Sequence, residues 1–286
     1  MLTRKEKADY IYQKITENHI YSWKDPRLCF PNGKSVLAFL HTQGHQEFKE
    51  SDDLTDRYVY KTLQKAKREL EKNEWTICFN AIEKNLESNP FIPLTHSQIV
   101  LPNQQTIANF LGEIKRKIKQ NSEYKEDLLS ALARLKQLQS ILKIDARFSF
   151  LEEQVCKNTH FNLSSNEKKF PDGSSCAAYW NYCQSKISQE LKEEDIYLNK
   201  KLKHLLMLAK QMRLLNHMEI LKQEIIADPQ FRFYKTQKTF EDGTKYRSCW
   251  EYCNRLVKKN KEKKPDKIEL SLYQTMAEID ELRRTK

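Results

Sequence analysis

Glycine and proline are scarce in this sequence. Only 5 glycines and 8 prolines occur among 286 residues, and both residue types disfavour the interior of a helix. Leucine, lysine, glutamate and glutamine are abundant, and these residues favour helices. The composition argues against a fold built from many strands and tight turns, and it predicts an all-α protein.

Long apolar runs and paired cysteines are missing as well. The start of the chain holds no stretch typical of a secretory signal peptide, and no segment reaches the roughly 18 apolar residues of a membrane span. The seven cysteines include no Cys-x-x-Cys pair, and free thiols in an odd number are typical of a reducing compartment. We therefore predict a cytoplasmic protein with no membrane partner.

Sequence patterns for catalysis are also absent. The phosphate-binding loop Gly-x-x-x-x-Gly-Lys-Ser/Thr does not occur. No pair of carboxylates, no nucleophile with a base and no set of metal ligands recurs along the chain. The histidines, among them His41, His45, His96, His160, His204 and His217, share no common position. We predict a protein that is not an enzyme and that binds no cofactor and no metal.

Four short turn motifs are present at a steady interval. Because proline presets φ, Asn and Asp tolerate left-handed geometry and glycine allows positive φ, each motif predicts a turn. The first residues of the motifs are separated by 71, 69 and 70 positions, which predicts four tandem units. Gln104 stands where the other motifs have glycine, so we expect a slightly different second turn. The motifs are Phe30-Pro31-Asn32-Gly33, Leu101-Pro102-Asn103-Gln104, Phe170-Pro171-Asp172-Gly173 and Phe240-Glu241-Asp242-Gly243.

A helix is predicted after each turn, because apolar residues recur there at i, i+3, i+4, i+7 and i+11. The first unit begins alike with Val36, Phe39 and Leu40, but it continues with Gln43 and Glu47. Such a polar end is typical of a capping unit that faces water. The other units fill the five positions with Ile107, Phe110, Leu111, Ile114 and Ile118, then Cys176, Tyr179, Trp180, Cys183 and Ile187, then Tyr246, Cys249, Trp250, Cys253 and Val257.

Two more amphipathic stretches complete each unit, so that a unit is a helix, an extended turn and two helices. The helix before the turn ends on an apolar residue, and Phe91, Phe161 and Phe231 follow it in a segment expected to pin the loop to the core. No glycine or proline lies between the third helix of one unit and the first helix of the next, which predicts near-continuous helices and an elongated array. The predicted units are 1–72, 73–143, 144–212 and 213–286. Their first helices end near Ile15, Leu86, Val155 and Ile225, and the predicted N-caps of their third helices are Asp53, Ser122, Asp195 and Asp266.

The fourth unit carries a family resemblance. Asp242-Gly243 leads to Trp250, and Asn254 and Arg255 follow it. This order resembles the helicase-associated domain, a small helical module that often occurs in tandem. The resemblance implies nucleic-acid binding without catalysis, because the motor of such proteins lies in a separate domain.

The other units match that pattern less closely. Two extra residues separate the glycine from the tryptophan relative to the family pattern, and the remaining departures lie at the tryptophan, amide and arginine positions. The third unit has Trp180, Gln184 and Ser185, the second has Leu111, Lys115 and Arg116, and the first has Leu40, Gly44 and His45.

Tryptophan and cysteine on the turn helices are predicted to be core residues. Trp180 and Trp250 lie on the apolar stripe, so they are expected to pack inside rather than to stack on bases. Four cysteines occupy positions that hold apolar residues in the second unit, and free cysteine is a common small core residue. We expect these cysteines to be buried and free of metal: Cys176, Cys183, Cys249 and Cys253.

Basic residues carry the functional prediction. The chain has 50 Lys and Arg against 39 Asp and Glu, a net charge of +11, and the fourth unit holds the largest positive excess. The leading prediction is a nucleic-acid-binding protein, for DNA or RNA, whose turn helices contact phosphates. The alternative is a helical scaffold that binds a protein partner, such as a secreted bacterial effector or an adaptor. The predicted contact residues are Lys115, Arg116, Lys117, Lys119, Lys186, Arg255, Lys258 and Lys259, with Lys261, Lys263 and Lys264 in the same basic run.

Overall fold

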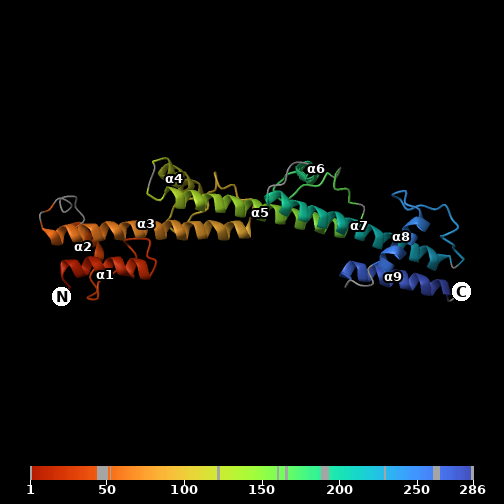
Figure 1. The fold of residues 1–286 in the computed structure, drawn as a ribbon, viewed down its shortest axis with the longest axis horizontal. Coiled ribbons are helices and arrows are strands. Elements are labelled where there is room, and N and C mark those ends of the chain that lie inside the picture. The colour runs from red at the N-terminus through yellow and green to blue at the C-terminus, as the bar shows by residue number, and fades with distance from the viewer. Residues whose placement is uncertain are drawn as a thin grey trace. The chain divides into compact units, whose positions relative to one another are not determined.

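The protein is all-α in the ranges that its computed structural model describes. These are residues 2–43, 51, 53–120, 123–159, 161–164, 167–187, 193–228, 230–259 and 265–284. Within them the chain forms nine helices and no strand, which confirms the predicted class (Figure 1). None of these helices is long and apolar enough to cross a membrane. The helices are α1 (Arg4–Glu17), α2 (Val36–Gln43), α3 (Leu54–Ser88), α4 (Ile107–Lys119), α5 (Lys125–Lys157), α6 (Cys176–Ile187), α7 (Glu193–Ala227), α8 (Tyr246–Lys259) and α9 (Lys267–Arg284).

Three long helices stand where the sequence predicted near-continuous connections. α3, α5 and α7 contain 35, 33 and 35 residues and are unbroken. The chain divides into two compact units, Met1–Leu142 and Lys143–Lys286. α5 crosses this division, so that its two parts belong to different compact units.

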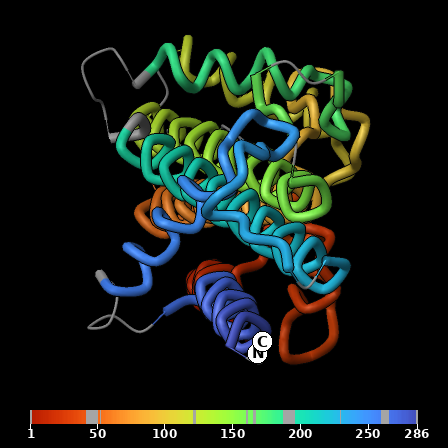
Figure 2. The backbone as a smooth tube through the Cα atoms, turned by 90° about the vertical axis from the view of Figure 1, so that its right-hand side faces the viewer, coloured from red at the N-terminus to blue at the C-terminus, as the bar shows by residue number. Residues whose placement is uncertain are grey.

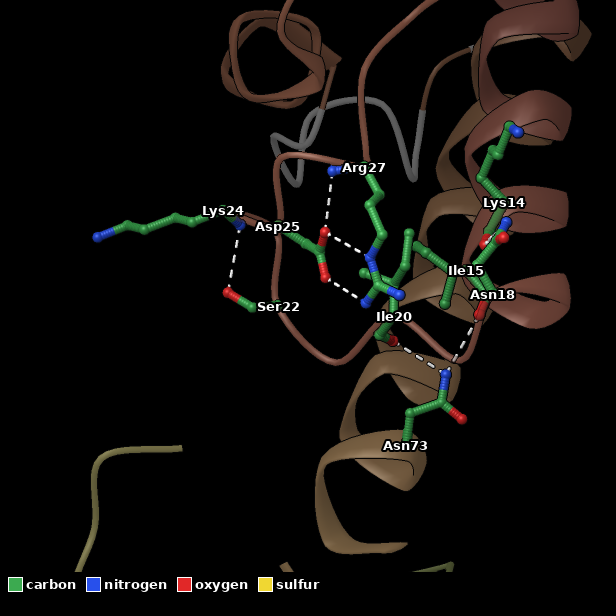
Figure 3. Close-up of polar contacts among 9 residues, drawn as sticks. All are labelled: Lys14, Ile15, Asn18, Ile20, Ser22, Lys24, Asp25, Arg27 and Asn73. Carbon is green, nitrogen blue, oxygen red and sulfur yellow. Dashed lines mark hydrogen bonds and ion pairs between the residues drawn. The ribbon is translucent and has the colours of Figure 1, made fainter. Parts of the chain in front are cut away.

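In the first compact unit, α1 lies parallel to the first part of α3 (Figure 1). Arg4 Nη2 pairs with Asp56 Oδ1 at 2.5 Å near one end of the two helices. Near the other end, the Asn73 amide donates to the carbonyls of Ile15 at 3.2 Å and Ile20 at 2.9 Å (Figure 3). One side chain of α3 thus holds both the end of α1 and the chain that leaves it.

In the second compact unit, α9 lies parallel to the last part of α7. Gln211 donates to Asp266 at 2.9 Å, and Lys222 pairs with Glu278 at 2.7 Å farther along both helices. Between α7 and α8 the chain loops away from the long helix and returns to it (Figure 2). This loop carries the fourth turn motif.

All four turn motifs adopt one geometry. In the first, Phe30 N–H donates to the Lys34 carbonyl at 3.0 Å and Gly33 N–H donates to the Phe30 carbonyl at 2.9 Å. The same two bonds form at Leu101, Phe170 and Phe240. In each turn the Asn or Asp side chain also accepts from the backbone N–H two residues ahead. This is a type I turn followed by a residue in the left-handed region.

Gln104 does not change its turn, contrary to our expectation. Gly33, Gly173 and Gly243 have φ of 76°, 80° and 81°, and Gln104 takes the same place with φ of 68°. The hydrogen bonds of the turn and the burial of Leu101 hold Gln104 there. The second turn therefore keeps its shape with a side chain that disfavours it.

The predicted apolar positions are core positions. Phe30, Leu101, Phe170 and Phe240 are all buried. Ile92, and not the predicted Phe91, is the buried residue that follows α3, since Ile92 N–H donates to the C-cap residue Asn89. Phe161 is buried as predicted, and Phe231 is half-buried.

The predicted helix starts are confirmed at Asp53 and Asp266. Asp53 accepts from Thr55 N–H at 2.8 Å, and Asp266 accepts from the N–H groups of Ile268 at 2.9 Å and Glu269 at 2.8 Å. Asp195 is not an N-cap, because α7 begins at Glu193 and includes it. The predictions on Gly44, His45, Glu47, Ser122 and His160 fall outside the described residues.

Candidate nucleic-acid interface

Helix α4 presents the clearest basic face. Thr106 caps it by accepting from Asn109 N–H at 3.3 Å. Its apolar stripe, which includes Ile107 and Ile114, is buried. The stripe directs Lys115, Arg116 and Lys119 to the solvent, and all three are exposed. No ion pair within the described residues holds these three side chains, so their charges are available to a ligand.

Lys117 differs from its neighbours. Its ammonium lies 3.6 Å from Glu71 and 3.7 Å from Glu113, and 4.8 Å from the centre of the Trp75 ring. The side chain is only 25% exposed. The prediction that Lys117 points away from the core is therefore wrong, because α3 offers it two carboxylates and an aromatic face.

Helix α8 repeats part of the α4 pattern. Arg255 and Lys258 are exposed, and each stands as far from the first residue of its helix as Arg116 and Lys119 do on α4. Arg255 Nε donates to the Glu251 carbonyl of its own helix at 3.4 Å. The side chain of Lys259 and the whole of Lys261, Lys263 and Lys264 lie outside the described residues.

Helix α6 carries less charge. Lys186 is half-buried and lies 5.9 Å from the centre of the Tyr182 ring, and Ser185 stands where α4 and α8 have arginine. The predicted residues of α4 belong to one compact unit and those of α6 and α8 to the other. Within the described part of the second unit, no hydrogen bond or ion pair joins Lys186 to Arg255 or Lys258.

A cation beneath the turn is a feature that sequence reasoning missed. Arg147 of α5 donates to Asp172 at 2.8 Å and to Ser174 at 3.3 Å. Its guanidinium lies 4.6 Å from the centre of the Tyr179 ring and 5.4 Å from that of Phe170. Partial burial raises the pKa of Asp172, but the hydrogen bonds from Ser174 and Arg147 outweigh it and hold that pKa below its usual value.

The same place is filled in the other units. His217 of α7 stacks on Phe240, with ring centres 3.9 Å apart and planes 7° apart, and its Nε2 lies 3.4 Å from Asp242 Oδ2. Lys7 of α1 lies 5.9 Å from the centre of the Phe30 ring. Lys7, Cys78, Arg147 and His217 step by 71, 69 and 70 residues, so the repeat interval itself was the signal that could have found them.

The environment of Cys249 argues against nucleophilic catalysis. Its Sγ lies 3.6 Å from His217 Nδ1, and Asp242 is on the other side of the ring, which is the order of a nucleophile, a base and an orienting acid. Both Cys249 and His217 are 2% exposed. The hydrogen bond with Cys253 and the burial raise the pKa of Cys249. A protonated thiol without access to solvent is a poor nucleophile, so the cluster ties the turn to the helices.

The tryptophans and cysteines of the turn helices are core residues, as predicted. Trp180 and Trp250 are buried, so neither offers its face to a base. Cys176, Cys183, Cys249 and Cys253 are buried with free thiols. Among the described residues, no three His, Cys, Asp or Glu side chains gather as a metal site.

Comparisons with protein families, with curated proteins and with solved structures find no match to this chain.

Proposed function

We propose that this protein is a non-catalytic nucleic-acid-binding protein whose turn helices contact phosphates. One observation carries the proposal: Arg116 and Lys119 of α4 and Arg255 and Lys258 of α8 are exposed at the same positions of two helices that follow the same turn. Guanidinium and ammonium groups at such a spacing neutralise backbone phosphates without reading sequence. The resemblance to the helicase-associated domain supports the same partner.

Four tandem units are the architecture that we propose for it. The four turns share their backbone hydrogen bonds, and an isolated bridge flanks each one. Each of four hydrophobic clusters draws its buried residues from a single predicted unit, 1–72, 73–143, 144–212 or 213–286. The cysteines of the described residues are free thiols, which fits a reducing compartment such as the cytosol.

The test is a charge reversal on α4. The triple variant Lys115→Glu, Arg116→Glu and Lys119→Glu leaves Lys117 in place, because Lys117 belongs to the packing of α3 and α4. A matched control reverses Lys61, Lys65 and Lys67, which are exposed on α3 and give the same change in net charge. Binding to labelled single-stranded and duplex DNA and RNA is measured at several salt concentrations.

The α4 variant is expected to lose affinity at low salt and to show a flatter salt dependence, by roughly 0.7 to 0.9 in log–log slope for each lost phosphate contact. The α3 control is expected to keep most of its affinity. If the unmodified protein binds no nucleic acid at low salt, or if both variants lose affinity equally, the proposal is wrong.

A groove in the first compact unit favours a second candidate, a scaffold that binds a protein helix. It has a volume of about 430 Å³ and is lined by Trp75, Phe79, Tyr124 and Leu128, with Thr76 at its side. Such a groove suits the apolar face of a partner helix. Substitution Thr76→Glu is expected to abolish that binding and to leave nucleic-acid affinity unchanged, which separates the two candidates.

A further inference from the structure

An arginine-lined pocket lies where the loop after α7 meets the end of α9. Its volume is about 880 Å³, and its walls include Gln230, Arg232 and Tyr234 from the loop and Asp280, Arg283 and Arg284 from the helix. None of these residues belongs to the turn-helix surface described above.

The pocket carries a positive excess. Three guanidinium groups face one carboxylate, and Asp280 pairs with Arg283 at 3.2 Å. Arg232 and Arg284 are exposed, and neither forms an ion pair within the described part of the chain. The partial negative charge at the C-terminal end of α9 is small beside these full charges, so an anion is the favoured occupant.

Arg283 is held in place by three aromatic rings. Its guanidinium carbon lies 5.2 Å from the ring centre of Phe233, 5.5 Å from that of Tyr234 and 5.7 Å from that of Trp250. Contacts of this kind fix a long side chain and leave less conformational entropy to be lost on binding. One wall of the pocket is thus preorganised.

Tyr234 adds a flat surface to the pocket. Its side chain is 40% exposed, and its ring meets the buried Phe233 nearly edge-on, with ring centres 5.7 Å apart. An exposed ring beside guanidinium groups can stack on a planar ligand, and every nucleic-acid base has such a face.

The fold does not require these residue types. Steps of 70 and 69 residues lead from Arg232 and Tyr234 to positions in the third and second units that hold no arginine and no aromatic residue. The position between them stays apolar in all three units, since Phe233, Leu163 and Leu94 pack in their clusters. The residues at the two outer positions are Asn162 and Ser164 in the third unit and Pro93 and Thr95 in the second.

We infer that this pocket binds one nucleotide of a nucleic-acid strand, with the phosphate on Arg232 and Arg284 and the base stacked on Tyr234. This inference rests on the proposed function for the identity of its ligand. It assigns to the fourth unit a contact with the base face, which the lysines and arginines of α4 and α8 do not supply. Arg283 and Asp280 are positioning residues that shape the wall of the pocket.

The experiment measures binding of adenosine monophosphate, adenosine and inorganic phosphate to the full chain by calorimetry. Stacking and charge pairing act together only on the monophosphate, so it is expected to bind at least about tenfold more tightly than either fragment. Variant Tyr234→Leu is expected to reduce the monophosphate to the affinity of phosphate, whereas Tyr234→Phe retains it. The double variant Arg232→Gln and Arg284→Gln is expected to lose both ligands, while the control Lys267→Gln, exposed on α9, keeps them.

Equal affinity for the monophosphate and for phosphate, no binding of the monophosphate, or no effect of the pocket variants would each overturn the inference. Thermal unfolding of every variant shows whether the fold is intact, and Tyr234→Phe and Lys267→Gln keep the test decisive if another variant unfolds.

A second arm uses a short single-stranded DNA and separates this inference from the proposed function. Weaker strand binding by the pocket variants supports the site. Unchanged strand binding by them, together with a loss in the α4 variant, overturns the site and leaves the proposed function standing. Binding of the monophosphate as expected, without binding of any strand, supports the nucleotide site and overturns the proposed function.

Discussion

Arg147 and Asp172 form an ion pair of 2.8 Å between α5 and the third turn, 25 positions apart in the sequence. Both side chains are mostly buried, at 21% and 19% exposure. The pair joins the turn to the long helix, where the Phe170 and Tyr179 rings flank the guanidinium.

Substitution Asp172→Asn isolates this ion pair. The amide oxygen still accepts from the backbone as Asn32 and Asn103 do in their turns, so only the charge is lost. We expect a loss of about 1 kcal/mol in the free energy of unfolding at pH 7, measured with urea. The exposed Glu87→Gln on α3 serves as the control and should change little.

The same variant should be less sensitive to acid. Because the folded protein holds the pKa of Asp172 below its unfolded value of about 3.9, the carboxylate stabilises the fold above that pH. This contribution disappears as the pH falls through the lower, folded-state value. The difference between the two proteins should therefore shrink below about pH 4. A difference that stays constant down to full protonation would contradict the assignment.

Gln104 is a position where a stabilising substitution is expected. A side chain at φ of 68° costs about 1 kcal/mol relative to glycine, so Gln104→Gly should raise the free energy of unfolding by that amount. Gly173→Ala should lower it similarly, since no atom lies within 4 Å of the added methyl group and only the backbone is strained. Gly112→Ala, inside helix α4, should instead stabilise the protein. Thermal melts of the three variants compare these signs directly.

Lys117 and Lys119 should respond differently to charge reversal. Lys117→Glu removes the contact with Trp75 and places a carboxylate beside Glu71 and Glu113, so it should cost about 1 kcal/mol or more. Lys119→Glu changes an exposed side chain and should stay within about 0.5 kcal/mol. Equal stability of the two variants would show that Lys117 is not held as the structure places it.

Thiol reactivity should follow burial. Cys156 is exposed and should react first with a thiol reagent at pH 8. Cys183 should stay silent until urea unfolds the protein, because burial raises the pKa of its thiol to about 11. Zinc analysis of the same purified protein should find no stoichiometric metal, and about one zinc per chain would contradict this prediction.

Periodic apolar residues made most of the fold predictable. The turn interval located every turn helix, and the burial of Trp180 follows from its place on the stripe. The start of α7 was missed because Asp195 is a good cap in any sequence, and the choice between neighbouring polar residues depends on loop geometry. Phe91 was preferred to Ile92 because its size suggested a core position, whereas the hydrogen bond to Asn89 decides which residue turns inward.

The candidate site was less predictable than the fold. Exposure of Lys115, Arg116 and Lys119 follows from helical spacing alone. The fate of Lys117 depends on Glu71 and Trp75, which belong to another helix, and a single-helix argument cannot see them. The histidines were compared with one another, so the place that His217 shares with Arg147 and Lys7 stayed hidden.

The long helices constrain where this chain can gain or lose a residue. Leu63, Leu132 and Leu202 each stand 23 residues before Leu86, Val155 and Ile225, and all six pack in hydrophobic clusters. One inserted residue inside such a helix would rotate everything beyond it by about 100° and turn one apolar face to water. From Val36, Ile107, Cys176 and Tyr246 to the next such leucine, Leu63, Leu132, Leu202 or Leu272, the count is instead 27, 25, 26 and 26. Insertions and deletions are thus confined to the stretch between the turn helix and that leucine, and this is why the intervals of 71, 69 and 70 differ while every helical phase is kept.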